Sequence, residues 1–291
     1  MDAVFPTSVN PSLELLEQDN ELRQIYPEEF YPNGAYFRSP WGKIRYYLLG
    51  PEDGVKVAMI HGVSVPSVAY TNIARRLAGC GFRVLLYDLF GRGYSESPKD
   101  NLDTANLYII QLALLLQYVE WPKARIVGFS LGGAITAGFA SMFPHLVDDR
   151  IVFLASAGLL ELPRNKAAER QPVQIANLDP SDLAFQLRIL QNKFLPAFKT
   201  IVRHDLTSSP ATGMEWAFGT LARPPPGKTD VFKVQVIHGT DDKIVPFEEA
   251  NKIRRLIPQA QIVPIVGASH YLVFVDGHWE QVADSIETFF S

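Results

Sequence analysis

The chain has 291 residues, of which 47% are hydrophobic and 20% are charged, and its net charge is -4. This composition provides for a large buried core and excludes a disordered chain. A net negative charge without a basic stripe argues against a nucleic-acid partner.

From the sequence we expect neither a secretory signal nor a membrane-spanning helix. The residues from Met1 to Gln18 include three acidic side chains and lack the basic start and apolar block of a secretory signal. No apolar run has the length of a membrane-spanning helix, so we expect no stable membrane insertion. The single Cys80 excludes an internal disulfide and predicts a buried structural thiol in a reducing compartment. We therefore expect a cytoplasmic location, and the sequence leaves a homodimer open.

The N-terminal part, residues 1–34, is predicted to be an extension that lies on the core. Apolar residues at helical spacing predict an amphipathic helix over 11–25, with Ser12 as its N-cap. Two strand-like segments, 35–39 and 43–48, then flank Pro40-Trp41-Gly42 and predict an antiparallel hairpin at the edge of a sheet.

From residue 56 onward, buried strands alternate with helices. The predicted strands are 56–60, 82–87, 125–129 and 150–155, and the predicted helices between them are 65–77 and 102–119. Such alternation is typical of a mainly parallel sheet that is covered by helices on both faces.

The alternation is interrupted over residues 157–230, which contain many prolines and helical patches but no convincing buried strand. We interpret this stretch as a helical cap, because it is too short to hold a large core alone. The sheet resumes with strands 233–237 and 261–265 and helices 247–256 and 278–289. The predicted core therefore comprises residues 35–156 and 231–291.

The most informative motif is Gly128-Phe129-Ser130-Leu131-Gly132, at the junction of a strand and a helix. A serine on such a sharp turn sits in strained backbone, and flanking glycines let the strand and the helix approach each other. The first helical turn also offers unpaired N–H groups to a developing oxyanion. The motif indicates that Ser130 is a nucleophile, although glycine-rich turns of this kind also occur in nucleotide-binding folds.

Two further loops follow strands that end at the same edge of the predicted sheet. One contains Asp241 and Asp242, and the other contains His270. The order Ser130, Asp242, His270 is the chain order of an acyl-transfer triad on such a sheet, in which the histidine takes the serine proton and the carboxylate orients the histidine. Either aspartate alone would more often cap the next helix. His238, the other candidate base, is interpreted as a packing or hydrogen-bonding residue.

Five blocks in this order resemble the α/β-hydrolase fold superfamily, and the resemblance covers residues 35–291. The blocks are His61-Gly62-Val63, Asp88-Leu89-Phe90-Gly91-Arg92-Gly93-Tyr94-Ser95, Gly128-Phe129-Ser130-Leu131-Gly132-Gly133, Gly239-Thr240-Asp241-Asp242-Lys243-Ile244-Val245-Pro246 and Gly267-Ala268-Ser269-His270. The resemblance implies an eight-stranded, mainly parallel sheet with helices on both faces and a helical cap.

The resemblance also implies roles for particular residues. In this family an Ile-Val-Pro-like run follows the acid after one intervening residue, which selects Asp242 over Asp241. The oxyanion hole would be built from the backbone N–H groups of Val63 and Leu131. The 88–95 block would be structural, with Arg92 bracing loops near the site.

The expected function is hydrolysis of a small carboxylic ester with an apolar acyl or aromatic part, through an acyl-enzyme and without a cofactor or a metal. Ser130, rather than an aspartate, counts against the epoxide hydrolases and dehalogenases of the family. The same triad serves C–C bond hydrolases of ring-cleavage products, thioesterases, lactonases, amidases and perhydrolases, and these alternatives stay open. A monoacylglycerol lipase and a non-enzymatic ligand receptor are further alternatives.

Overall fold

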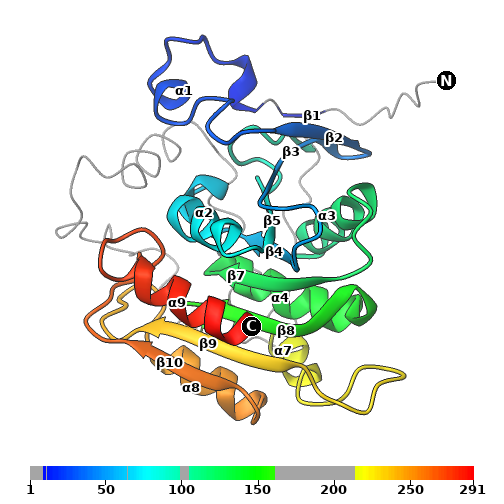
Figure 1. Ribbon diagram of the computed structural model, residues 1–291, viewed down its shortest axis with the longest axis vertical. Coiled ribbons are helices and arrows are strands. Elements are labelled where there is room, and N and C mark those ends of the chain that lie inside the picture. Colours follow the sequence, from blue (N-terminus) through cyan, green and yellow to red (C-terminus); the bar gives the residue numbers. More distant parts are fainter. Residues whose placement is uncertain (1–8, 11, 64, 99–104, 161–213) are drawn as a thin grey trace, which may run out of the picture.

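The computed structural model describes residues 9–10, 12–63, 65–98, 105–160 and 214–291. These residues form three layers, in which one large sheet lies between two layers of helices (Figure 1). A separate short pairing joins β1 (Val9–Asn10) to β6 (Ser97–Pro98).

The large sheet has eight strands in the order β10-β9-β8-β7-β4-β5-β3-β2. The pairs β2–β3 and β3–β5 are antiparallel. All other neighbouring strands in the sheet are parallel. In chain order these strands are β2 (Ala35–Ser39), β3 (Gly42–Leu49), β4 (Lys56–Ile60), β5 (Arg83–Tyr87), β7 (Ala124–Phe129), β8 (Val147–Leu154), β9 (Lys233–Gly239) and β10 (Gln261–Ile265).

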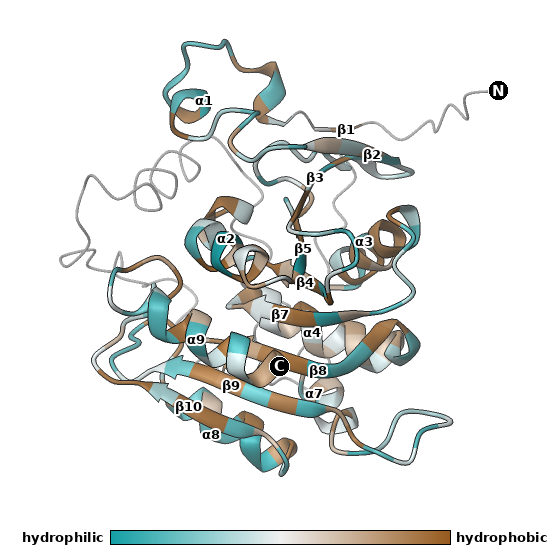
Figure 2. Cartoon of the chain, in the orientation of Figure 1, coloured by the Kyte–Doolittle hydropathy of each residue, from teal (hydrophilic) through white to brown (hydrophobic). Residues whose placement is uncertain are grey.

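Helices cover both faces of the sheet. One face is covered by α2 (Thr71–Gly79) and α9 (Trp279–Phe290), and the other by α3 (Ala105–Tyr118), α4 (Leu131–Met142), α7 (Glu215–Thr220) and α8 (Glu248–Leu256). A separate hydrophobic cluster fills each side. The inner strands β7 and β8 carry long brown stretches in Figure 2, whereas α8 and α9 mix brown and teal, as expected for helices with one buried face.

The eight-stranded, mainly parallel sheet confirms the predicted fold class. The hairpin of β2 and β3 lies at one edge of the sheet, as predicted from the segments around Trp41. The helix predicted over 65–77 is shorter: a 3₁₀ turn, η2 (Ser67–Tyr70), precedes α2.

The prediction of one amphipathic helix over 11–25 is wrong. Ser12 caps only a single 3₁₀ turn, η1 (Leu13–Leu15), by accepting a hydrogen bond from the Glu14 N–H. Asn20 then accepts a hydrogen bond from the Leu22 N–H and starts a separate helix, α1 (Glu21–Ile25). A side-chain cap within the predicted helix therefore divides it, since such caps compete with continuous helical hydrogen bonding.

The prediction of a buried Cys80 is also wrong, because this thiol is exposed. Cys80 is the C-cap of α2, and its backbone N–H turns back onto the last helical carbonyls. Gly81 follows with φ of 89°, so the chain turns away at the surface.

The predicted cap over 157–230 falls largely on residues 161–213, which lie outside the described residues. The described chain stops at Leu160 and resumes at Met214, whose backbone nitrogen lies 3.4 Å from the Gly158 carbonyl oxygen. The two ends of the insertion therefore meet at one point beside α4 and β8. No helix in the described part of the chain combines the length and the apolarity needed to cross a bilayer.

Candidate active site

Ser130 occupies the sharp turn between β7 and α4, with φ of 54° and ψ of -116°. A Cβ atom added at Gly128 would lie closer than 3.0 Å to the backbone of Gly132, and one added at Gly132 would clash with the carbonyl oxygen of Ile60. The two glycines therefore let strand and helix approach, and the backbone at Ser130 is held in a region that L-residues rarely adopt. Both features were expected from the sequence motif.

The structure brings Ser130, His270 and Asp242 together. The Nε2 atom of His270 lies 3.0 Å from Ser130 Oγ, and its Nδ1 atom lies 2.7 Å from Asp242 Oδ2. The three residues are at most 6% exposed. Because a carboxylate can only accept, Nδ1 carries the proton, and the lone pair of Nε2 faces the serine hydroxyl.

Asp242 is held by its own loop. Its Oδ1 atom accepts hydrogen bonds from the backbone N–H groups of Ile244 and Val245, both at 2.8 Å. Burial would raise the pKa of Asp242, but the electrostatic interaction with His270 and the hydrogen bonds to the carboxylate outweigh burial and hold the pKa well below its usual range. The neighbouring Asp241 instead accepts a hydrogen bond from Thr240 Oγ1 at the surface.

His238 is fully buried behind this carboxylate. Its Nε2 atom donates to the Val245 carbonyl oxygen at 2.8 Å and lies 3.4 Å from Asp242 Oδ2. This places His238 as a hydrogen-bonding residue of the acid loop, in line with the interpretation from the sequence.

The residues expected to form an oxyanion hole flank Ser130. Leu131 is the first residue of α4, and Val63 lies in the turn that follows β4. A Cβ atom added at Gly62 would be 3.2 Å from the Ser130 Cβ atom, so this turn passes directly beside the serine. The Val63 carbonyl oxygen accepts a hydrogen bond from Arg92 Nε at 2.6 Å, which is the bracing contact expected of Arg92.

Sequence reasoning missed the anchoring of that turn by His61. The His61 Nε2 atom accepts the Leu89 N–H at 2.9 Å, and its Nδ1 atom donates to the Gly62 carbonyl oxygen at 2.7 Å. Burial lowers the pKa of His61 to about 3, so the imidazole is neutral. The partner Leu89 lies after another strand, β5, and no local pattern in the sequence reveals this contact.

Within the described residues, no three His, Cys, Asp or Glu side chains are grouped so that they could hold a metal ion. The arrangement consists of a hydroxyl hydrogen-bonded to an imidazole, a carboxylate that accepts from the same imidazole, and the first amides of a helix, all at the carboxyl ends of the parallel strands. This set can carry out nucleophilic attack on a carbonyl carbon.

A model of the alpha/beta hydrolase family matches residues 57–285. The chain belongs to this family. The matched range includes Val63, Ser130, Asp242 and His270, together with the loops in which they lie.

Similar alpha/beta hydrolase family proteins occur in several bacteria. An uncharacterized protein of Mycobacterium tuberculosis is 28% identical, over 88% of this chain and 81% of its own. The 2-hydroxy-6-oxo-2,4-heptadienoate hydrolase of Pseudomonas putida is 25% identical, over 79% and 84%. The structure of a meta-cleavage product hydrolase from Pseudomonas fluorescens superposes with a TM-score of 0.67 at 21% identity and covers 88% of this chain and 97% of that one. This structural likeness establishes the shared fold.

Proposed function

We propose that this protein is a serine hydrolase that cleaves a carboxylic ester with an apolar acyl or aromatic part. The observation that carries the proposal is the continuous hydrogen-bonded line from Ser130 Oγ through His270 to Asp242, with distances of 3.0 and 2.7 Å. Membership of the alpha/beta hydrolase family supports it.

In the proposed reaction Ser130 Oγ attacks the acyl carbon while its proton passes to His270 Nε2. The negative charge that develops on the carbonyl oxygen is stabilised by the N–H groups of Val63 and Leu131. His270 then gives the proton to the departing alcohol, and the acyl group remains on Ser130. A water molecule that loses a proton to His270 attacks this acyl-enzyme, which releases the acid and restores the serine.

Asp242 has two functions in this scheme. It fixes the tautomer of His270 in which Nε2 is free to accept the serine proton, and it stabilises the imidazolium that forms. Since its pKa is held below the usual range, Asp242 remains ionised at neutral pH.

The proposal is tested by a fluorophosphonate that forms a covalent adduct with activated serines. We expect the adduct on Ser130, with no labelling of the Ser130→Ala variant. A correctly folded protein that is not labelled would contradict the proposed function. A panel of esters of increasing acyl length, with a thioester and a lactone, then identifies the preferred bond.

A second candidate is hydrolysis of a C–C bond in a ring-cleavage product, because the Pseudomonas putida relative is named as a 2-hydroxy-6-oxo-2,4-heptadienoate hydrolase. The two candidates separate in one assay. Loss of the conjugated chromophore of such a dienoate at a higher kcat/KM than that for any ester would favour C–C hydrolysis, and the reverse ranking would favour the esterase.

A further inference from the structure

The N-terminal segment, residues 12–34, lies outside the part of the chain that the family model matches, yet it enters the protein interior. Leu22 and Tyr26 are at most 1% exposed. Both belong to a hydrophobic cluster that includes Val65 and Val68, which follow Val63 along the chain. The segment therefore packs directly on the polypeptide that leads away from the turn beside Ser130.

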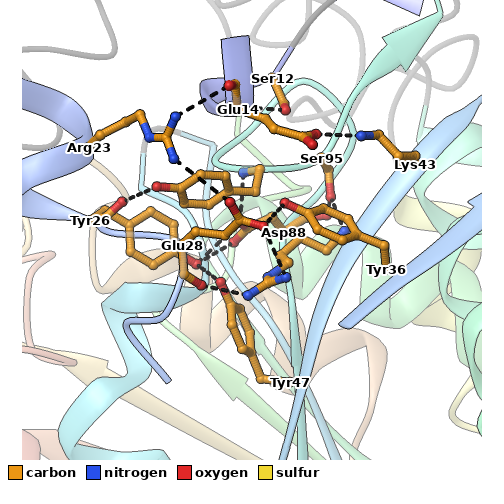
Figure 3. A network of polar contacts seen from close by, with 12 residues as sticks. Ser12, Glu14, Arg23, Tyr26, Glu28, Tyr36, Lys43, Tyr47, Asp88 and Ser95 are labelled. Atoms are coloured by element: carbon orange, nitrogen blue, oxygen red, sulfur yellow. Dashed lines mark hydrogen bonds and ion pairs between the residues drawn. The ribbon is translucent and has the colours of Figure 1, made fainter. Parts of the chain in front are cut away.

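The Tyr26 hydroxyl is part of a buried network of polar contacts (Figure 3). It lies 3.2 and 3.3 Å from the two carboxylate oxygens of Asp88, 3.0 Å from Ser67 Oγ and 3.0 Å from the Tyr47 hydroxyl. Asp88 also accepts from the backbone N–H groups of Ser67 and Tyr94, both at 3.0 Å, and from Ser67 Oγ at 2.8 Å. Burial raises the pKa of Asp88 and these donors lower it, so each donor matters to the charged form.

This network holds one end of the turn that follows β4. Ser67, the first residue of η2, is bound to Asp88 through both its backbone N–H and its hydroxyl. Tyr26 bridges the same two residues, because its hydroxyl touches Ser67 and Asp88 together.

The other end of the turn is held by the next residue along from Asp88. The Leu89 N–H donates to His61, and His61 donates to the carbonyl oxygen of Gly62. That carbonyl belongs to the same peptide unit as the Val63 N–H, so the imidazole fixes the plane of the group assigned to the oxyanion. Asp88 and Leu89, two consecutive residues after β5, therefore hold the two ends of the turn that follows β4.

We propose that Tyr26 is a positioning residue for the oxyanion side of the active site. It acts through Asp88 and Ser67 on the turn that carries Val63, and the inference rests on the proposed function. Removing its hydroxyl takes one donor from a buried carboxylate and removes the contact between Tyr26 and the Ser67 hydroxyl. Misplacement of a catalytic group by a fraction of an ångström to one ångström lowers turnover markedly, whereas binding of the remainder of a substrate is unaffected.

The test compares Tyr26→Phe with Tyr36→Phe. Each variant loses a single hydroxyl. Tyr36 donates at 2.8 Å to Glu28, another residue of the N-terminal segment, and does not contact Asp88. This control therefore loosens the segment at the edge of the network in Figure 3 and leaves the hydrogen bonds of Asp88 in place.

Two readouts are made on the full chain: amide hydrogen exchange at Ser67, and the rate at which fluorophosphonate labels Ser130. For Tyr26→Phe we expect exchange to be about tenfold faster, and labelling and kcat about tenfold slower, with KM changed by less than about twofold. For Tyr36→Phe we expect values like those of the unmodified protein. If Tyr26→Phe does not fold, Tyr47→Phe removes the hydroxyl that supports Tyr26, and we expect smaller changes in the same direction.

Labelling of Tyr26→Phe at the unmodified rate would overturn the inference, as would equal losses in both variants. Failure of the unmodified protein to react at all would contradict the proposed function itself, and the positioning role of Tyr26 with it. The two failures are distinguishable, because only the second is seen before any substitution is made.

Discussion

His270 Nε2 lies 3.0 Å from Ser130 Oγ, although 140 residues separate the two along the chain. The contact depends on two parallel strands, β7 and β10, whose carboxyl ends reach the same edge of the sheet. Because the histidine contacts the Ser130 hydroxyl directly, removal of that one oxygen atom tests whether Ser130 is the nucleophile.

Ser130→Ala is expected to lower kcat/KM by about four powers of ten or more, because no other group can form the acyl-enzyme. The midpoint of thermal unfolding should stay close to that of the unmodified protein. Steady-state hydrolysis of the best ester in the panel, with circular dichroism as the folding control, makes the comparison. Turnover within tenfold of normal would refute the nucleophile assignment.

Asp242→Asn and Asp241→Asn form a matched pair at adjacent positions. Asp242 accepts from His270 at 2.7 Å, whereas Asp241 faces the surface, so only the first change disturbs the tautomer of the base. We expect Asp242→Asn to lose about three to four powers of ten in kcat and Asp241→Asn to stay within about twofold. A greater loss in Asp241→Asn would show that the wrong aspartate has been assigned.

Ser130→Gly should be more stable than Ser130→Ala. Both variants lack the hydroxyl, but only glycine adopts φ of 54° and ψ of -116° without strain. We expect the free energy of unfolding to be higher for the glycine variant by about 1 kcal/mol. Urea denaturation of the two inactive variants measures this difference, and an alanine variant of equal or greater stability would contradict the strain.

The buried His61 should make stability depend on pH. Burial lowers its pKa from 6.5 to about 3, so between these values the unfolded chain binds a proton that the folded protein does not. Stability is therefore unaffected by His61 above 6.5 and falls as the pH drops below it, by at most about 1.4 kcal/mol for each pH unit. We expect a shallower dependence in His61→Gln.

Urea denaturation at pH values from about 7.5 to about 4.5 tests this expectation. Asp88, whose raised pKa acts in the opposite direction, is present in both proteins, so the difference between their slopes isolates His61. Parallel curves for the two proteins would rule out the neutral, buried imidazole.

Much of the fold could be predicted because its signals are local. Apolar runs identified the strands of the sheet, and the glycines around Ser130 predicted the turn that the structure has. The approach of His270 and Asp242 followed from the ends of parallel strands. The predicted N-terminal helix was wrong because hydrophobic spacing did not register the second cap, at Asn20, which begins a separate helix after the turn that Ser12 caps.

Other features have no local signal. The contact of Tyr26 with Asp88 spans 62 residues, and although Asp88 belongs to a recognised motif, nothing in the sequence around either residue points to the other. Cys80 was predicted to be buried because free cysteines usually are, but its exposure depends on where α2 ends. Such features depend on tertiary packing rather than on periodicity.

The hydrogen-bond contact between Met214 and Gly158 means that the intervening chain departs from and returns to the same spot. Joining two neighbouring points costs little more entropy for a long connection than for a short one. Residues 161–213 could therefore be replaced, in evolution or by engineering, with a segment of different length while β8 and β9 remain paired.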